Sequence, residues 1–306
     1  MPQKKQHSFP FSTKLKLHLM RHSTEFASKI IQTDKDSPNI HSMYNIPYRQ
    51  NCDNLQKFDW HTPTISLRDN QNILMPTIFY LHGGAWSSAD KKYYTRFCKD
   101  MAERGFTIIN INYRLLPEFT LNDAYQDCIS AIRYCIKHNQ DFAINPDKII
   151  IAGDSAGAHL SALITAKATS GILKIPCKFV GSILLYGLYN LQHMANSKFS
   201  ILPPLHQGFK QDKGKNISRF YRDFSPVSFT TSSFPPTFLC CGKCDTLSPE
   251  TIEFNEILHN HNVTTYPLIF PRERRDARHA FINLNNSARH ETIMAISKAL
   301  KKFIKD

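Results

Sequence analysis

The sequence predicts an α/β fold in which a mostly parallel sheet is flanked by helices. Two observations support this fold class. Short runs rich in β-branched and aromatic residues alternate with longer helical segments from residue 77 onward, which is the order that parallel sheets require. The chain has 306 residues, of which 42% are hydrophobic and 21% are charged, so it can bury a large core as an ordinary globular protein.

The alternation gives an expected position for each element. We expect strands near residues 77–82, 107–113, 148–153, 180–186, 237–242 and 265–270, and an antiparallel part of the sheet before residue 75. We expect helices near residues 91–103, 121–139, 156–170, 249–261 and 288–304. The last of these places Ile293, Ile296 and Leu300 on one face and its lysines elsewhere, which is typical of a helix with one side against the core.

Two segments do not follow the alternation. Residues 1–60 are polar and weakly patterned. Residues 188–224 contain Pro203-Pro204, Gly208 and Gly214, which are expected to break any long helix.

The most informative motif is Gly153-Asp154-Ser155-Ala156-Gly157, which follows the apolar run Ile149-Ile150-Ile151. A G-x-S-x-G sequence after such a run predicts a buried strand that turns sharply into a helix and exposes the serine at the turn. A serine hydroxyl is a poor nucleophile unless a base removes its proton. The motif therefore predicts a histidine and a carboxylate elsewhere in the chain.

A second motif, His82-Gly83-Gly84-Ala85-Trp86, follows the strand-like run 77–81. Rigid backbone N–H groups can stabilise the negative oxygen of a tetrahedral intermediate, and adjacent glycines let the main chain approach a substrate. We expect an oxyanion hole formed by the amides of Gly83, Gly84 and Ala156.

The partners of Ser155 are expected in the order serine, acid, histidine. Asp245 follows the strand expected at 237–242, and His279 follows the apolar run 264–270. Both thus lie beyond the carboxyl ends of strands, where ligands gather in open α/β sheets. We predict that Ser155 attacks the substrate, that His279 transfers the proton, and that Asp245 orients the imidazole.

Other titratable residues are weaker candidates. Asp154 is expected to point away from the serine on the tight turn, and Glu250 and Asp276 are the reserve carboxylates. His82 is expected to shape the glycine loop, and His159, one helical turn after the serine, is expected to pack or form hydrogen bonds.

Taken together, these segments resemble the α/β-hydrolase superfamily, in the branch of the hormone-sensitive-lipase-like and feruloyl-esterase-like carboxylesterases. The matching segments are residues 82–86, Asn112-Tyr113-Arg114-Leu115-Leu116-Pro117-Glu118, 153–157, Ser225-Pro226, 242–247 and 279–281. The resemblance implies a hydrolytic triad at Ser155, Asp245 and His279, and an oxyanion hole at Gly83, Gly84 and Ala156. It also implies a single domain over residues 1–306, with 1–60 and 188–224 as cap segments. Arg278 stands where the family commonly has glycine.

The expected function is hydrolysis of carboxylic esters with short-to-medium acyl groups, with no cofactor. Because residues 155–160 also resemble kynurenine formamidases, amide hydrolysis is an alternative, and a catalytically silent binding protein is another. Trp86 is predicted to bind substrate. A set of apolar residues in the second cap segment either lines an acyl pocket or only packs on the sheet: Phe199, Ile201, Leu202, Leu205 and Phe209.

Charge and targeting signals set further expectations. The formal net charge of +13 suits nucleic acid or an anionic membrane, but the positive residues are scattered and no nucleic-acid-binding motif is found, so no nucleic-acid partner is expected. No apolar run is long enough to span a membrane or to form a signal peptide, so we expect a cytoplasmic protein without stable membrane insertion. The sequence leaves a homodimer open. The basic loop 272–278 is expected to contact either an anionic substrate or solvent.

Eight cysteines are present, and most lie in helix-like or strand-like contexts that favour buried thiols. Cys241-Gly242-Lys243-Cys244 spells C-x-x-C, but no second pair follows at a useful spacing. We expect no metal site and no disulfide framework.

Overall fold

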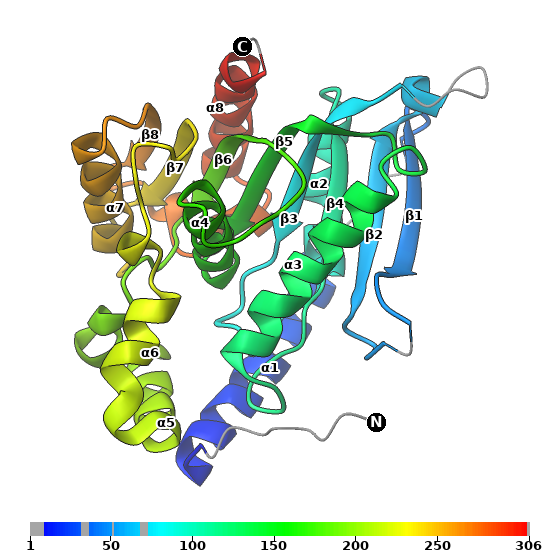
Figure 1. The fold of residues 1–306 in the computed structure, drawn as a ribbon. Coiled ribbons are helices and arrows are strands. Elements are labelled where there is room, and N and C mark those ends of the chain that lie inside the picture. The colour runs from blue at the N-terminus through cyan, green and yellow to red at the C-terminus, as the bar shows by residue number, and fades with distance from the viewer. Residues whose placement is uncertain (1–8, 32–36, 51, 68–72, 305–306) are drawn as a thin grey trace.

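The computed structural model describes residues 9–31, 37–50, 52–67 and 73–304 (Figure 1). Its centre is an eight-stranded sheet with the strand order β1-β2-β4-β3-β5-β6-β7-β8. The strands are β1 (Ile40–Pro47), β2 (Lys57–Pro63), β3 (Met75–Leu81), β4 (Thr107–Ile111), β5 (Ile144–Asp154), β6 (Phe179–Leu185), β7 (Thr237–Gly242) and β8 (Thr265–Phe270).

The sheet is parallel from β4 to β8, and its first two strands are antiparallel. β3 pairs in parallel with β4 and β5, and β5 to β8 continue the parallel part. β2 runs antiparallel to both β1 and β4. These pairings confirm the mostly parallel sheet and the antiparallel part expected before residue 75.

The centre of the sheet brings the two motif loops together. β5 lies between β3 and β6, and its Ile149, Ile150 and Ile151 are fully buried. Leu81 at the end of β3 is in register with Gly153 near the end of β5. The loop that begins at His82 therefore leaves the sheet beside the turn that carries Ser155.

Helices cover both faces of the sheet, as predicted. They are α2 (Thr95–Ala102), α3 (Leu121–Lys137), α4 (Ala156–Thr169), α7 (Ser248–Asn260) and α8 (Ser287–Phe303). Side chains of α3 and α4 pack with Phe79 and Leu81 of β3, whereas side chains of α2 and α8 pack with Ile78 and Tyr80. Because successive strand residues point to opposite faces, the two helix pairs lie on opposite sides of the sheet (Figure 1).

The N-terminal segment differs from its expectation. Its first described element is a 21-residue helix, α1 (Phe11–Ile31), which was not predicted from the sequence. Residues 40–47 and the start of β2 lie in the sheet, so the expectation that all of residues 1–60 form a cap is wrong. Among the described residues of that segment, α1 lies apart from the sheet and contacts α5.

The segment 188–224 contains two α-helices, although its prolines and glycines were expected to break any long helix. α5 (Leu202–Lys213) has Pro203 and Pro204 in its first turn, where an N–H would have no helical partner in any case. Gly208 stays within α5, and Gly214 ends it with φ at 50°. α6 (Ile217–Phe224) follows and packs on α5. These helices and the start of α1 lie together at the lower end of the molecule in Figure 1.

A membrane-spanning helix is not found among the described residues.

Candidate active site

The turn between β5 and α4 holds Ser155 in a strained conformation. Its φ is 50° and its ψ is −118°, a backbone conformation that residues other than glycine rarely adopt. A Cβ atom on Gly157 would collide with the Leu81 carbonyl, and one on Gly153 would collide with Gly157. The two glycines of the motif are therefore required for β5 and α4 to pack this closely beside β3.

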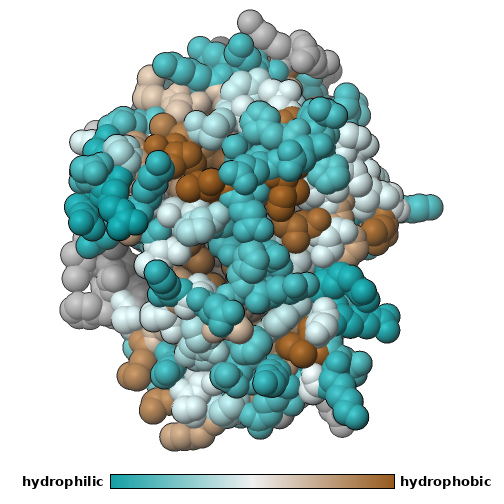
Figure 2. Space-filling view, turned by 90° about the vertical axis from the view of Figure 1, so that its left-hand side faces the viewer, coloured by the Kyte–Doolittle hydropathy of each residue, from teal (hydrophilic) through white to brown (hydrophobic). Residues whose placement is uncertain are grey.

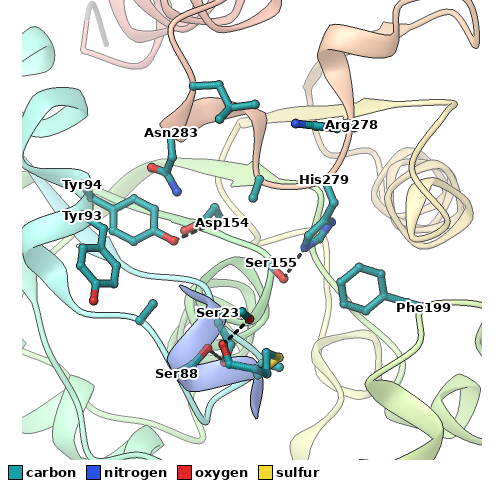
Figure 3. A pocket seen from close by; sticks show the side chains of 16 residues that line it. Ser23, Ser88, Tyr93, Tyr94, Asp154, Ser155, Phe199, Arg278, His279 and Asn283 are labelled. Atoms are coloured by element: carbon teal, nitrogen blue, oxygen red, sulfur yellow. Dashed lines mark hydrogen bonds between the residues drawn. The ribbon is translucent and has the colours of Figure 1, made fainter. Parts of the chain in front are cut away.

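Ser155, His279 and Asp245 form a continuous hydrogen-bonded chain, and Figure 3 shows its first bond, between Ser155 and His279. The Ser155 Oγ lies 2.9 Å from His279 Nε2. His279 Nδ1 lies 2.7 Å from Asp245 Oδ2, and Asp245 Oδ1 accepts a hydrogen bond from the Leu247 amide at 2.9 Å. The structure thus brings together the three residues predicted as a triad.

The two loops that carry Asp245 and His279 are packed against each other. A Cβ atom on Gly242, at the end of β7, would collide with the Ala277 carbonyl of the His279 loop. Asp276 in the same loop accepts a hydrogen bond from the Ala288 amide at 2.9 Å, which ties the loop to the start of α8. The reserve carboxylate Asp276 therefore supports the loop and does not contact the serine.

The second reserve carboxylate, Glu250, is also engaged away from the serine. It accepts a hydrogen bond from His193 Nδ1 at 2.7 Å and one from the Tyr189 amide at 3.4 Å. Of the three candidate carboxylates, Asp245 is thus the one that contacts His279.

The glycine loop departs from the expected oxyanion hole at one position. The Gly83 amide donates to Asp154 Oδ1 at 2.7 Å, and Tyr94 Oη lies 3.2 Å from the same nitrogen. The prediction that this amide faces the substrate is therefore wrong for Gly83. In the described part of the chain, the amides of Gly84, Ala85 and Ala156 donate to no protein acceptor.

Gly84 has a conformation that needs glycine. Its φ is 107°, and a Cβ atom there would collide with the Ser88 carbonyl. The Gly84 carbonyl accepts hydrogen bonds from the Ser87 and Ser88 amides, each at 3.0 Å. The loop is thus a tight turn with two free amides next to Ser155.

His82 shapes this loop, as predicted. Its ring stacks on Tyr113 at 4.3 Å between centroids, and its Nδ1 donates to the Gly83 carbonyl at 2.7 Å. Burial lowers the pKa of His82 to about 4, so the ring is neutral at physiological pH.

Asp154 has a role that sequence reasoning missed. Its buried carboxylate accepts hydrogen bonds from the hydroxyls of Tyr80 and Tyr94, each at 3.1 Å, in addition to the one from Gly83. Burial raises the pKa of Asp154 to about 6, although these hydrogen bonds favour the ionised form. Asp154 points away from the triad, as expected, but it points toward the glycine loop and holds it.

A cavity of about 460 Å³ lies in front of Ser155. The glycine loop contributes Gly84 and Ala85 to its wall, and α1 contributes Met20 and Ser23. Tyr93, Tyr94 and Asn283 lie toward one end of the cavity, and Phe199 and His279 lie toward the other (Figure 3).

Sequence comparison places this site in a family. The model of the BD-FAE family matches residues 64–255, which include the glycine loop, Ser155 and Asp245. The chain belongs to the BD-FAE family. His279 lies beyond the matched residues, so its position beside Ser155 is a property of this structure that the family match does not cover.

Two curated relatives of this BD-FAE chain have names that describe an activity. "Probable carboxylic ester hydrolase LipM" of Mycobacterium tuberculosis is 26% identical over 249 residues, which cover 79% of this chain and 56% of the relative. "Acetyl esterase" of Salmonella paratyphi B is 27% identical over 235 residues, which cover 72% of this chain and 69% of the relative. The chain spans 50% of a third relative, "Esterase LipQ" of Mycobacterium tuberculosis. It therefore matches only a part of several relatives.

Solved structures show that the BD-FAE chain has the α/β-hydrolase fold. The structure of esterase B from Lactobacillus rhamnosus superposes with a TM-score of 0.82 at 19% identity and covers 95% of both chains. A bacterial heroin esterase superposes with a TM-score of 0.74 at 20% identity and covers 97% of this chain and 95% of its own. At this level of identity, the likeness is one of fold.

Trp86, which was predicted to bind substrate, does not line the cavity. It is buried and donates from Nε1 to His159 Nδ1 at 3.2 Å. His159 in turn donates from Nε2 to the Phe224 carbonyl at 2.7 Å. Burial lowers the pKa of His159 to about 4, so the neutral ring accepts one hydrogen bond and donates the other. His159 therefore has the structural role that was predicted for it.

The apolar residues of the second cap segment divide between the two expected roles. Phe199 lines the cavity, and its ring centroid lies 4.5 Å from that of His279. The other four pack in the hydrophobic core and do not line the cavity: Ile201, Leu202, Leu205 and Phe209.

The residues of the basic loop 272–278 also differ in what they contact. Arg278 lines the cavity, whereas Arg274 is paired with Asp276 at 2.9 Å and with Glu291 at 2.8 Å. Only part of the loop therefore faces the site.

The C-x-x-C motif lies beside the Asp245 loop. Cys244 Sγ lies 3.4 Å from the Arg274 carbonyl, and burial raises the pKa of Cys241 to about 12. Within the described ranges there is no group of three or more residues that could hold a metal ion.

Proposed function

We propose that the protein is a serine hydrolase that cleaves carboxylic esters through an acyl-enzyme intermediate. The observation that carries this proposal is the hydrogen-bonded chain from Ser155 through His279 to Asp245, at the wall of a largely apolar cavity. The names of the relatives support it, since LipM and the acetyl esterase are both named for the hydrolysis of esters.

In the first step, His279 Nε2 accepts the proton of Ser155 as Oγ attacks the ester carbonyl carbon. The carbonyl π electrons move to the oxygen, which becomes negative. Asp245 stabilises the imidazolium through its hydrogen bond with Nδ1, and it keeps the ring in the tautomer that accepts at Nε2.

The negative oxygen needs donors that are already in place. We assign this role to the amides of Gly84, Ala85 and Ala156, which have no acceptor among the described residues and border the cavity or the nucleophile. This set replaces Gly83 by Ala85, because the Gly83 amide is held by Asp154.

Collapse of the tetrahedral intermediate breaks the bond to the alcohol oxygen, which takes the proton from His279 Nε2. The alcohol leaves, and Ser155 carries the acyl group as an ester. A water molecule then gives its proton to His279 and attacks the acyl carbon, and the acid product leaves as Ser155 regains the proton.

The size of the cavity favours substrates with acyl groups of short to medium length. Its volume of about 460 Å³ must hold both the acyl and the alcohol parts of a substrate. Phe199 stands against His279 at one end and Tyr93 lies at the other, and α1 contributes to the wall through Met20 and Ser23. A long chain would have to extend out of this space.

No structural observation favours the formamidase alternative. That alternative was based on the run 155–160, in which His159 is buried between Trp86 and Phe224 and does not line the cavity. Amide hydrolysis by the same triad is therefore an outcome of the test and not a second proposal.

The test is covalent labelling together with kinetics. A fluorophosphonate probe should add to wild-type Ser155, as shown by mass spectrometry of the peptide, and Ser155→Ala should lose both labelling and nearly all hydrolysis of p-nitrophenyl butyrate. Ser23→Ala changes another serine of the cavity wall and should keep both.

Absence of labelling in the wild type would favour a silent binding protein and contradict the proposal. Full activity in Ser155→Ala would contradict the mechanism. Faster cleavage of N-formylkynurenine than of any ester would replace the ester substrate by an amide.

A further inference from the structure

α1 carries a row of exposed apolar side chains. Phe11 is 80% exposed, Leu15 is 46% exposed and Leu19 is 60% exposed. Their four-residue spacing places them on one stripe along the helix, which also includes His18 and His22. We call Phe11, Leu15 and Leu19 the α1 ridge.

The opposite side of α1 is attached to the rest of the protein. Leu17 is buried in the main hydrophobic core, and Thr13 donates to the Pro204 carbonyl at 3.3 Å. Arg21 forms a two-pronged ion pair with Glu118, at 2.9 and 3.2 Å, and also donates to the carbonyls of Leu116 and Ser87. The ridge is therefore presented by an anchored helix.

Cations lie on both sides of the ridge. At about 100° per residue, Lys14 and Lys16 each lie about 60° from its edges, one on each side. Both are exposed, and neither forms an ion pair within the described residues. This pattern, an apolar stripe bordered by lysines, is typical of helices that lie on anionic lipid surfaces.

The neighbouring helices add positive charge. α5 contacts α1, and exposed Lys210 and Lys215 belong to α5 and to the turn after it. The acidic residues of this region, in contrast, are paired: Asp212 with Lys213 at 2.8 Å and Asp223 with Arg219 at 3.5 Å. In Figure 2, apolar side chains project among hydrophilic ones at the lower edge, where α1 and α5 lie in Figure 1.

These observations favour a lipid surface over a second copy of this chain. Two copies that met through the α1 ridge would bring their lysines together and repel each other, in a chain whose net charge is already +13. Lipid phosphates would instead pair with the same lysines while the ridge enters the boundary of the acyl chains.

We propose that α1 is an interfacial helix that docks the protein on an anionic lipid surface. Phe11, Leu15 and Leu19 enter the interface, and Lys14 and Lys16 contact its phosphates. Met20, the residue after the ridge, lines the cavity, so the docked protein holds the cavity close to the lipid. The inference that the substrates are apolar esters dissolved in the lipid rests on the proposed function. The docking itself does not.

The experiment is flotation of the full chain with vesicles of phosphatidylcholine, with or without one third phosphatidylglycerol, at low salt. The wild type and Ser155→Ala should both float with the anionic vesicles and not with phosphatidylcholine alone. The triple variant F11S/L15S/L19S and the double variant K14E/K16E should each bind at least about tenfold more weakly. Added salt should weaken the binding of the wild type.

A matched control changes three exposed apolar residues elsewhere. Ile65 is 52% exposed, Ile172 is 61% exposed and Met294 is 56% exposed, so I65S/I172S/M294S removes similar apolar surface and should float like the wild type. The ridge, lysine and control variants should hydrolyse a water-soluble ester at the wild-type rate if they are folded and the proposed function holds, whereas Ser155→Ala should float without hydrolysing it.

Three outcomes would overturn the docking proposal. The wild type does not float with the anionic vesicles, the ridge variant floats as well as the wild type, or the wild type floats equally well with phosphatidylcholine alone. A concentration-dependent dimer that is lost in the ridge variant, without vesicle binding, would assign the ridge to a second copy instead. If the wild type floats with anionic vesicles but hydrolyses no ester, the docking proposal stands and the proposed function is rejected.

Discussion

The carboxylate of Asp154 accepts the hydrogen bond of the Gly83 amide at 2.7 Å, and this contact links the turn of the nucleophile to the glycine loop. The link explains why the Gly83 amide is unavailable to a substrate. It also gives the second residue of the Gly-Asp-Ser-Ala-Gly motif a positioning role, in which Asp154 holds the loop so that the next two amides can face the cavity.

Asp154 should affect stability in a pH-dependent way. Burial raises its pKa from 3.8 to about 6, so the folded protein binds this proton more tightly than the unfolded chain does. The resulting stabilisation is fully present below about pH 3.8 and is lost as the pH rises through about 6. In urea unfolding, the free energy of unfolding of the wild type minus that of Asp154→Asn should be larger at acid than at neutral pH by up to about 3 kcal/mol. A difference that does not change with pH would mean that Asp154 ionises as it does in the unfolded chain.

The same residue should influence catalysis through the glycine loop. Asp154→Asn keeps an oxygen that can accept from Gly83, whereas Asp154→Ala leaves that buried amide without an acceptor. We expect Asp154→Ala to lower kcat by about tenfold or more with little change in KM, and Asp154→Asn to restore most of kcat. Equal kcat values in the two variants would show that the hydrogen bond does not position the loop.

Gly84→Ala should inactivate the protein. A Cβ atom there meets the Ser88 carbonyl, and φ is 107°, so the loop must move and displace the donors of the proposed oxyanion hole. Loss of one such donor lowers kcat by about 100- to 1,000-fold. Gly105→Ala is the matched control, since Gly105 also has a positive φ of 92° but an added Cβ would meet nothing within 4 Å. It should lower the thermal stability and leave kcat unchanged, and similar kcat losses in both variants would count against the assignment.

Asp245→Asn should leave the fold intact and lower kcat by about 10,000-fold, because the imidazole would adopt the wrong tautomer. Circular dichroism checks the fold, and hydrolysis of p-nitrophenyl butyrate measures the loss. Glu250→Gln removes a carboxylate that bonds a different histidine, His193, and should keep most of the activity. A larger loss of kcat in Glu250→Gln than in Asp245→Asn would show that Asp245 is not the acid of the triad.

The chain-length preference should depend on Phe199. Specificity constants for p-nitrophenyl acetate, butyrate, octanoate and laurate should peak at a short or medium chain in the wild type. Phe199→Ala removes the ring next to His279 and should shift the peak toward longer chains. Trp86→Phe should reduce stability without moving the peak, because Trp86 is buried away from the cavity. A wild-type peak at laurate would contradict the small-cavity interpretation.

The sequence predicted the sheet and the three triad residues because a parallel sheet collects the carboxyl ends of its strands at one edge. Any polar residue that follows such a strand is therefore close to the others, whatever the distance along the chain. Asp245 and His279 could be chosen because they follow β7 and β8 closely and in the chain order serine, acid, histidine.

The incorrect predictions concern contacts that the spacing of the motifs does not reveal. Which of two adjacent amides faces the cavity depends on the position of the Asp154 carboxylate, and the burial of Trp86 depends on His159, 73 residues away. α1 was missed because its apolar residues lie on two sides, with Leu17 toward the core and the ridge toward the outside, so no one-sided pattern is visible.

The attachment of α1 also has a consequence during synthesis of the chain. α1 is made before its partners, because Thr13 bonds the Pro204 carbonyl 191 residues later and Arg21 bonds Glu118 97 residues later. At about 5–20 residues per second, a ribosome needs about 10–40 s to travel from Thr13 to Pro204. Through that interval the nascent helix lacks its partner helix α5. Nascent α1 is therefore open to a chaperone at the ribosome exit until α5 has been made.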